Sequence, residues 1–174
     1  RRAKHPIVFL TGAGISQESG ISPFRDANGL WNNHKLEEVA SPEGFEKNPQ
    51  LVLDFYNARR RQLDEVKPNE AHHLIAQLET KYNVTIITQN IDDLHERAGS
   101  TNVLHLHGEL RKCRSSKNPN LIYTCTQDIK LGDLASDGNQ LRPHIVWFGE
   151  AVTEIEKAIA ITQSADLFVI VGTS

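Results

Sequence analysis

The 174-residue sequence contains no methionine, only two cysteines and no apolar run longer than a strand. Two cysteines are too few for the disulfide framework of a small secreted protein. The longest apolar runs, such as Leu167–Val171, fall far short of the roughly 20 residues that cross a bilayer. The net charge of −3 lacks the basic excess of a nucleic-acid binder. We therefore expect a cytoplasmic protein that binds neither membranes nor nucleic acid.

The composition is that of a globular protein with a true core. Hydrophobic residues make up 39% of the chain and charged residues 24%, which excludes disorder. The chain opens on arginine and stops at Gly172-Thr173-Ser174, directly after a strand-like run. We therefore expect it to begin inside a longer parent sequence and its sheet to be C-terminally incomplete.

Strand-like runs alternate with helix-like stretches, the pattern of an α/β protein. Most of the runs are continuously apolar, as parallel strands buried on both faces must be. We predict a Rossmann-like parallel sheet with helices on both faces. The expected strands are Ile7–Thr11, Val84–Thr88, Val103–His107 and Leu167–Val171, with Ile145–Phe148 as a shorter candidate.

Helix signals lie between these strands. Asn48-Pro49 supplies an N-cap and a first-turn proline for a helix that reaches Asp64. Asn69 caps a second helix, and a third precedes the last strand. The apolar faces predicted for these two helices comprise Ala71, Leu74, Ile75 and Leu78 in the first, and Ile155, Ala158, Ile159 and Thr162 in the second.

The stretch from Glu109 to Leu141 is polar and breaks the strand–helix pattern. It indicates an inserted module outside the sheet. We assign residues 1–34, 66–110 and 141–174 to the discontinuous Rossmann-like domain. Residues 35–65 form a helical module and residues 111–140 a small inserted module, and together they make a second, smaller domain.

Gly12-Ala13-Gly14 follows the first expected strand directly. Glycines at this point let backbone N–H groups approach a pyrophosphate at a helix N-terminus. The sequence is not the full dinucleotide fingerprint, because Gln17 stands where a third glycine is needed. A simple tight turn is the alternative. A later loop with Phe24, Arg25 and Trp31 either folds over a nucleotide or is a surface Ω-loop.

Polar residues also follow the second and third expected strands. Gln89, Asn90 and Asp92 come where the second strand ends, which is the ligand edge of an open α/β sheet. Helix capping by Asn90 or Asp92 is the alternative. His105 and His107 lie two apart and are expected on one strand face. His107 ends that strand and can act as a general base near neutral pH, whereas His105 is expected to be a packed or capping residue.

Taken together, these motifs occur in the order and spacing of one family. The chain resembles the sirtuin family, and within it the bacterial CobB type (class III), everywhere except Arg111–Gln140. The motifs that carry the resemblance are GAGIS at 12–16, the Pro-Phe-Arg loop at 23–25, QNID at 89–92, His107-Gly108, RPHIVWFGE at 142–150 and Gly-Thr-Ser at 172–174.

The resemblance implies an NAD-dependent protein-lysine deacylase that consumes NAD as co-substrate. In that reaction the acyl-lysine oxygen displaces nicotinamide from the ribose, and the acyl group passes to ADP-ribose. The implied catalytic residues are His107 and Asn90. Val146, Trp147, Phe148 and Gly149 would pair with the substrate backbone as a strand. The implied NAD-binding residues are Gly12, Ala13, Gly14, Ile15, Glu18, Phe24, Arg25, Trp31, Gln89, Asn90, Ile91, Asp92, His107, Gly172, Thr173 and Ser174.

The chain departs from the family at the zinc module. Sirtuins usually hold a structural zinc on two cysteine pairs, but this segment has only Cys113 and Cys125. No histidine lies between Glu109 and Leu141 to complete four ligands. We therefore expect a degenerate zinc-type module without metal.

Tyr56 and Arg59 lie three apart on the first predicted helix, so both project to one side. A solvated basic helix end, Arg59–Arg61, is the alternative. An acyl chain that ends in carboxylate would suit an arginine fork and a tyrosine hydroxyl. The pair resembles the sirtuins that remove succinyl and malonyl groups, and we expect acetyl, succinyl and malonyl-lysine proteins as substrates. Nothing in the sequence indicates an oligomeric state.

Two other functions compete with this interpretation. A nicotinamide dehydrogenase would need the full glycine fingerprint and an acidic residue soon after the second strand, where QNID stands instead. The other candidate is a truncated, catalytically inactive module that binds NAD, ADP-ribose or an acyl-peptide without turnover.

Overall fold

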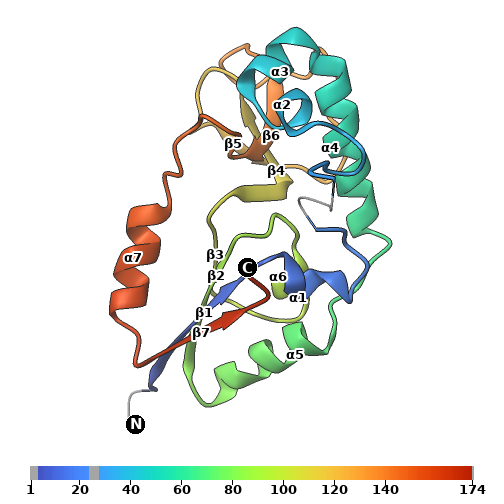
Figure 1. Ribbon diagram of the computed structural model, residues 1–174. Coiled ribbons are helices and arrows are strands. Elements are labelled where there is room, and N and C mark those ends of the chain that lie inside the picture. Colours follow the sequence, from blue (N-terminus) through green and yellow to red (C-terminus); the bar gives the residue numbers. More distant parts are fainter. Residues whose placement is uncertain (1–3, 24–27, 174) are drawn as a thin grey trace. The chain divides into compact units, whose positions relative to one another are not determined.

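The computed structural model describes residues 4–23 and 28–173, which form two compact units (Figure 1). The described residues of the first unit lie within 1–23, 66–107 and 152–174, and those of the second within 24–65 and 108–151. The predicted division differs at the joins: it assigned residues 28–34, 108–110 and 141–151 to the sheet domain, whereas these residues belong to the second unit. No helix in the described ranges has both the length and the apolar character needed to cross a membrane.

The first unit is built on a parallel sheet in the order β3-β2-β1-β7. Its strands are β1 (Pro6–Thr11), β2 (Asn83–Thr88), β3 (Val103–His105) and β7 (Leu167–Val171). All four predicted strands are confirmed, but β3 is two residues shorter than predicted. The chain turns after it and enters the next strand through Gly108, whose φ of 90° glycine adopts readily. His105 and His107 therefore do not share a strand face.

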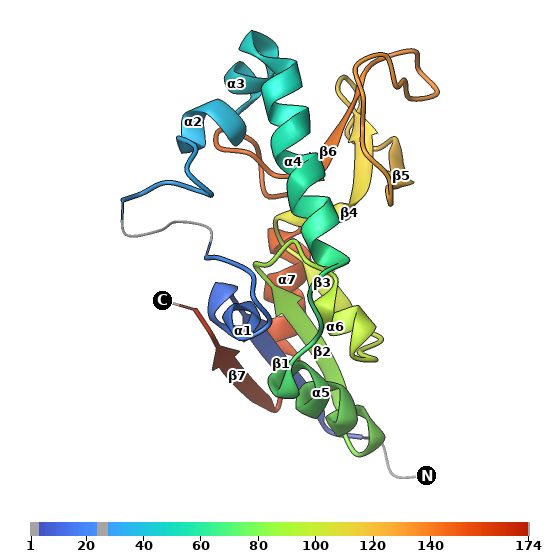
Figure 2. The ribbon, with the colours of Figure 1, turned by 90° about the vertical axis from the view of Figure 1, so that its right-hand side faces the viewer.

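Helices cover both faces of this sheet, as predicted (Figure 2). On one face Ile7, Phe9, Val84 and Ile86 pack against Ile15 and Ile75. On the other, Val8, Ile87 and Leu106 pack against Ala158. The alternation of Ile7, Val8 and Phe9 between the faces follows from the two-residue period of a strand. The helices of this unit are α1 (Ala13–Gln17), α5 (Glu70–Gln77) with the 3-10 turn η1 (Leu78–Thr80), α6 (Leu94–Arg97) and α7 (Ile155–Gln163).

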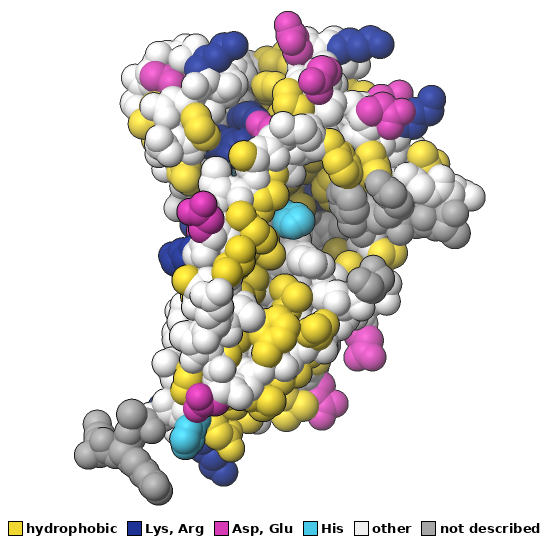
Figure 3. Space-filling model, turned by 60° about the vertical axis from the view of Figure 1, so that its left-hand side comes forward, with side chains coloured by type: hydrophobic (Ala, Val, Ile, Leu, Met, Phe, Trp, Pro, Cys, Tyr) yellow, Lys and Arg dark blue, Asp and Glu magenta, His cyan; other side chains and the backbone are white. Residues whose placement is uncertain are grey.

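Two predicted helix faces are only partly buried. In α5, Ile75 is buried but Leu74 is 53% exposed, because the helix meets the sheet along a narrower stripe than predicted. In α7, Ala158 is buried and Ile159 is 51% exposed. Figure 3 shows hydrophobic side chains gathered on this face, to which exposed residues of α7 and β7 contribute: Ile155, Ile159, Leu167, Phe168 and Ile170.

The second unit combines three helices with an antiparallel sheet in the order β5-β4-β6. Asn48 Oδ1 accepts the N–H of Leu51 and Pro49 stands in the first turn of α4, so the predicted helix start is confirmed. Its core contains Leu53, Cys113, Cys125 and Ile129. The elements are α2 (Leu36–Val39), α3 (Pro42–Lys47), α4 (Pro49–Leu63), β4 (Gly108–Ser115), β5 (Ile122–Thr124) and β6 (Leu141–Ile145).

The candidate strand Ile145–Phe148 is wrong. The strand is β6, which ends at Ile145 and pairs antiparallel with β4. Beyond it the chain closes a turn, because Glu150 Oε1 accepts the backbone N–H of Trp147 and the N–H of Glu150 donates to Trp147 O. The sequence pattern of apolar residues did not reveal this turn, since it depends on a carboxylate three residues away.

Candidate functional site

Gly12 and Gly14 follow β1 and lie at the start of α1. Their backbone N–H groups donate to Val171 O at 3.0 Å and Gly172 O at 2.9 Å. A Cβ on Gly12 would lie 2.7 Å from Gly172 O, and a Cβ on Gly14 would lie 2.7 Å from Gly172 Cα. Both glycines are therefore required by close packing against the chain after β7. Their N–H groups, predicted to face a pyrophosphate, are already engaged within the protein.

Asn90, directly beyond the carboxyl end of β2, is anchored to the neighbouring strand. Its Nδ2 donates to Gly12 O at 2.9 Å, and its backbone N–H donates to Thr88 Oγ1 at 3.1 Å. The carbonyl oxygen of Asn90 lies 2.9 Å from Nδ1 of His105, whose Nε2 lies 3.1 Å from Glu96 Oε2. The segments that follow β1 and β2 therefore lie side by side, and His105, expected to be a packed or capping residue, supports the second of them.

Asp92 is almost fully buried and serves two partners. Its Oδ2 accepts the hydroxyl of Ser16 at 2.8 Å, and its Oδ1 accepts the backbone N–H of Leu94 at 3.1 Å. The second bond satisfies the first backbone N–H of α6, so Asp92 supports the start of that helix although its N-cap position is Asp93. Burial raises the pKa of Asp92, while the Ser16 and Leu94 hydrogen bonds oppose that shift. Ser16 therefore belongs to the site through its bond to Asp92, a contact that the sequence did not predict.

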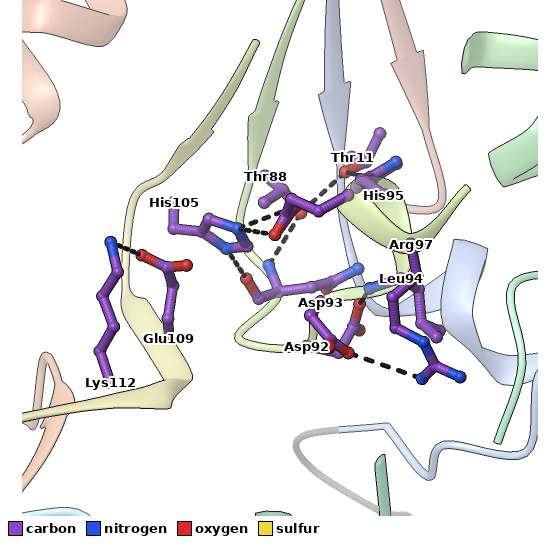
Figure 4. Close-up of polar contacts among 12 residues, drawn as sticks. Thr11, Thr88, Asp92, Asp93, Leu94, His95, Arg97, His105, Glu109 and Lys112 are labelled. Carbon is purple, nitrogen blue, oxygen red and sulfur yellow. Dashed lines mark hydrogen bonds and ion pairs between the residues drawn. The ribbon is translucent and has the colours of Figure 1, made fainter. Parts of the chain in front are cut away.

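Behind these residues lies a buried polar cluster that sequence patterns did not predict (Figure 4). The Thr11 hydroxyl donates to Thr88 Oγ1 at 2.8 Å and lies 2.9 Å from His95 Nε2. The His95 ring packs edge-on against His72, with 5.0 Å between centroids. Both imidazoles are buried, and burial lowers their pKa values, to about 3 for His95 and about 4 for His72. Both histidines are therefore neutral in the folded protein near pH 7.

This pair predicts a loss of stability in mild acid. The pKa of each histidine is lowered on folding, so the unfolded chain takes up protons first as pH falls below about 6.5. Between pH 7.5 and 5, the free energy of unfolding should fall by about 2–4 kcal/mol from these two groups.

Denaturant titrations at a series of pH values measure this loss. His95→Gln keeps a hydrogen-bonding amide beside Thr11 and should flatten the dependence. His73→Gln, on the exposed side of α5, removes only the smaller electrostatic cause of the His72 shift and should leave most of the dependence in place. An equally steep dependence in His95→Gln would contradict the prediction.

His107 lies just beyond β3 and is half-buried. Burial lowers its pKa, so the imidazole is held in the neutral form that can accept a proton. Of the other predicted NAD-binding residues, Ile15 is buried in the core, while Glu18, Gln89 and Gly172 are exposed and Ala13, Ile91 and Thr173 are half-buried. Phe24, Arg25 and Ser174 lie outside the described residues.

Trp31 belongs to an aromatic cluster of the second unit. Its buried ring meets Phe55 edge-on at 4.8 Å and Tyr56 at 5.7 Å between centroids. The structure thus gives Trp31 a packing role inside the second unit, whereas the role in covering a nucleotide stays a prediction.

Tyr56 and Arg59 lie on α4 and present donors that the described residues leave without acceptors. The Tyr56 hydroxyl accepts the indole N–H of Trp147 at 2.9 Å, its one hydrogen bond there. The Arg59 Nε is buried without a partner, and its guanidinium lies 5.2 Å from the centre of the Phe55 ring. Burial lowers the pKa of Arg59. Unmet buried donors are costly, so this face of α4 is suited to an acceptor from outside the chain.

Cys113 and Cys125 do not fit a zinc site. Both are buried, and Cys125 Sγ donates to Gln127 O at 3.3 Å. The side-chain interaction between the two sulfurs raises the pKa of Cys113 and lowers that of Cys125. The buried guanidinium of Arg60 lies near both sulfurs and would repel a cation. Within the described part of the second unit, no three His, Cys, Asp or Glu side chains gather closely enough to share an ion. Structural zinc needs four such ligands.

We therefore predict that the protein folds without zinc. Purified protein should carry well under one zinc per chain by elemental analysis, and a chelator should leave its melting temperature unchanged. Stoichiometric zinc together with unfolding on chelation would contradict this prediction.

Comparisons with known proteins support one family. The sequence model described as the Sir2 family matches residues 12–174. The chain is 63% identical over 168 residues to an NAD-dependent protein deacylase of Helicobacter pylori (strain ATCC 700392 / 26695), which covers 97% of this chain and 73% of the relative. It is 59% identical over 174 residues to an NAD-dependent protein deacylase of Bacteroides thetaiotaomicron, with 97% and 74% covered.

A solved structure described as a Sir2 homologue–NAD complex is similar in fold. The TM-score is 0.85 at 42% sequence identity, and the match covers 98% of this chain and 69% of that one.

Proposed function

The chain belongs to the Sir2 family, and on this premise we propose that it removes acyl groups from protein lysines with consumption of NAD. The observation that carries the proposal is the polar edge of the first unit, where Asn90 and the residues after β1 are held together by Gly12 O and Thr88. The names of its relatives and the match along residues 12–174 support the same activity.

We propose that NAD binds at this edge, since ligands of open α/β sheets lie beyond the carboxyl ends of the strands. The exposed side chain of Gln89 is available there, whereas the N–H groups of Gly12 and Gly14 are bonded to Val171 O and Gly172 O. NAD would supply an electrophilic ribose carbon and nicotinamide as its leaving group. Asn90, held by Thr88 and Gly12, would orient the ribose, and Asp92 would meet the carboxamide.

His107 would act as the general base. Its lowered pKa keeps the imidazole neutral, so it can take a proton from a ribose hydroxyl and leave that oxygen able to attack the bound acyl group. Water then releases the free lysine and acylated ADP-ribose. The remaining assigned contacts, including Ala13, Ile15, Glu18, Ile91, Gly172 and Thr173, are part of the same proposal.

For the acyl group we propose acetyl, succinyl and malonyl, bound along α4 in the second unit. The support is the pair of unmet donors at Tyr56 and Arg59. A carboxylate would accept from both, and Arg binds carboxylates with two parallel hydrogen bonds.

The substrate backbone would run beside Val146–Gly149. The N–H groups of Trp147 and Phe148 already donate to Glu150 Oε1 and Ala40 O. The main-chain hydrogen bonds to the substrate would therefore be formed by Val146 and Gly149. Strand addition of this kind needs only main-chain hydrogen bonds and tolerates many peptide sequences.

The test is turnover with NAD and matched acetyl-lysine and succinyl-lysine peptides. Nicotinamide release together with deacylated peptide, detected by mass spectrometry, supports the proposal. Reduced-nicotinamide absorbance would indicate a dehydrogenase instead. Binding of ADP-ribose or peptide without any turnover would indicate the inactive binding module.

A further inference from the structure

The side chain of Trp147 lies between Tyr56 of the proposed acyl site and the guanidinium of Arg142, all within the second unit. On one side its indole Nε1 donates to Tyr56 Oη at 2.9 Å. On the other, the guanidinium of Arg142 lies 3.6 Å from the centre of the indole ring. Trp147 is 2% exposed, so both contacts are shielded from water.

The hydrogen-bond chemistry of this pair has only one arrangement. An indole N–H donates and cannot accept, so the Tyr56 oxygen must be the acceptor. The phenol hydrogen then has to point elsewhere, and the described residues offer it no acceptor. Burial raises the pKa of Tyr56, so the phenol keeps its hydrogen. Tyr56 is thus held as a donor.

Several contacts keep the indole in place. Arg142 forms two hydrogen bonds with Glu150, from Nη1 to Oε2 at 2.8 Å and from Nη2 to Oε1 at 2.9 Å. Arg142 Nη2 also donates to Ile145 O at 2.7 Å. Glu150 Oε1 accepts the backbone N–H of Trp147 at 2.9 Å. The same carboxylate therefore fixes both the backbone of Trp147 and the cation stacked on its ring, an arrangement favourable for a buried indole.

We propose that Trp147 is a positioning residue for acyl selection: its indole N–H occupies the Tyr56 oxygen and reserves the phenol hydrogen for the carboxylate of an acidic acyl chain. This inference rests on the proposed function, which assigns Tyr56 and Arg59 to that carboxylate. Without the indole donor, the Tyr56 O–H can rotate to other directions, and its hydrogen points toward the acyl carboxylate for a smaller share of the time.

The hydrogen bond can be tested without any activity measurement. The sequence has two tryptophans, so a ¹⁵N-labelled sample gives two indole signals, and Trp31→Phe assigns them. Tyr56→Phe keeps the aromatic ring and removes only the acceptor oxygen. The Trp147 indole proton should move upfield in Tyr56→Phe, and an unmoved signal would overturn the inference.

The functional coupling is tested by a double-mutant cycle on the full chain. Trp147→Phe and Tyr56→Phe should each lower kcat/KM for a succinyl-lysine peptide by about 3- to 10-fold more than for the acetyl-lysine peptide, the size expected for one neutral hydrogen bond. Because Trp147 acts through Tyr56, the double variant should lose no more selectivity than Tyr56→Phe alone. Losses of selectivity that multiply would overturn the inference.

Arg59→Met separates this inference from the proposed function. Arg59 does not contact Trp147, so a selective loss of desuccinylation in Arg59→Met supports the carboxylate site whatever the cycle gives. If Arg59→Met reduces both activities equally, the proposed acyl class is wrong. If Arg59→Met impairs desuccinylation selectively but the selectivity losses of Trp147→Phe and Tyr56→Phe multiply in the double variant, only the positioning role of Trp147 is wrong.

Discussion

Replacement of His107 by alanine is expected to abolish deacylation while NAD binding survives. A positioned general base contributes typically 10²- to 10⁴-fold to a rate, so kcat should fall by about that factor. His107 is half-buried and its pKa is lowered, so the wild-type imidazole is ready to accept a proton near neutral pH. NAD binding precedes the proton transfer and should therefore be retained, as it should be in His107→Tyr if the larger ring is accommodated.

The measurements are nicotinamide release under saturating peptide and NAD affinity by calorimetry. His73→Ala is the matched control, because His73 is exposed on α5 and lies outside the proposed site. Near-normal turnover in His107→Ala would remove His107 from the mechanism. Loss of NAD affinity equal to the loss of rate would assign His107 to binding instead of proton transfer.

The second large effect is expected at Arg59, where methionine should impair desuccinylation selectively. An Arg–carboxylate interaction in a partly desolvated site contributes about 2–4 kcal/mol, which corresponds to about 30- to 1,000-fold in kcat/KM. Acetyl-lysine has no carboxylate to lose, so deacetylation should remain within a few-fold or improve. Methionine retains the unbranched stem of the arginine side chain and removes the charged guanidinium that lies over Phe55.

Neighbouring arginines differ in their value as controls. Arg61 is exposed and ion-paired with Asp128 at 2.6 Å, so Arg61→Met should leave both activities near wild type. Arg60 is unsuitable, because its buried side chain donates to Leu110 O and Asn57 Oδ1 and its loss would destabilise the unit. Equal losses of both activities in Arg59→Met would mean that Arg59 supports the fold and not the acyl group.

Local chemistry predicted the parts of the fold that depend on neighbours in the sequence. The cap at Asn48 with its first-turn Pro49 and the cap at Asn69 are side-chain contacts within three residues, so the sequence reveals them directly. The parallel strands were predicted from continuously apolar runs, which are also a feature of neighbouring residues in the sequence. The end of β3 was missed because Gly108 and the turn before it depend on pairing with β6, more than thirty residues later.

The candidate site was predictable in its position and much less so in its contacts. The ends of β1 and β2 had to meet at one edge, so the proximity of Gly12 and Asn90 followed from the parallel topology. Hydrogen bonds between residues such as Thr11 and His95, or Trp147 and Tyr56, join positions 84 and 91 apart in sequence. No periodicity or local motif predicts such pairs, because only the tertiary fold brings the two residues together.

The link between the Gly12–Gly14 segment and β7 also has a consequence for the order of folding. β1 pairs with β7 through Ile7 and Leu167, which lie 160 residues apart (167 − 7), and Gly14 N–H donates to Gly172 O. Contacts between such distant residues form slowly, and during synthesis β7 leaves the ribosome after every element of the second unit. All residues of the second unit emerge before it and can build their own core first. The turn at Gly12–Gly14 therefore acquires its final shape only once Gly172 has been made, after all residues of the second unit.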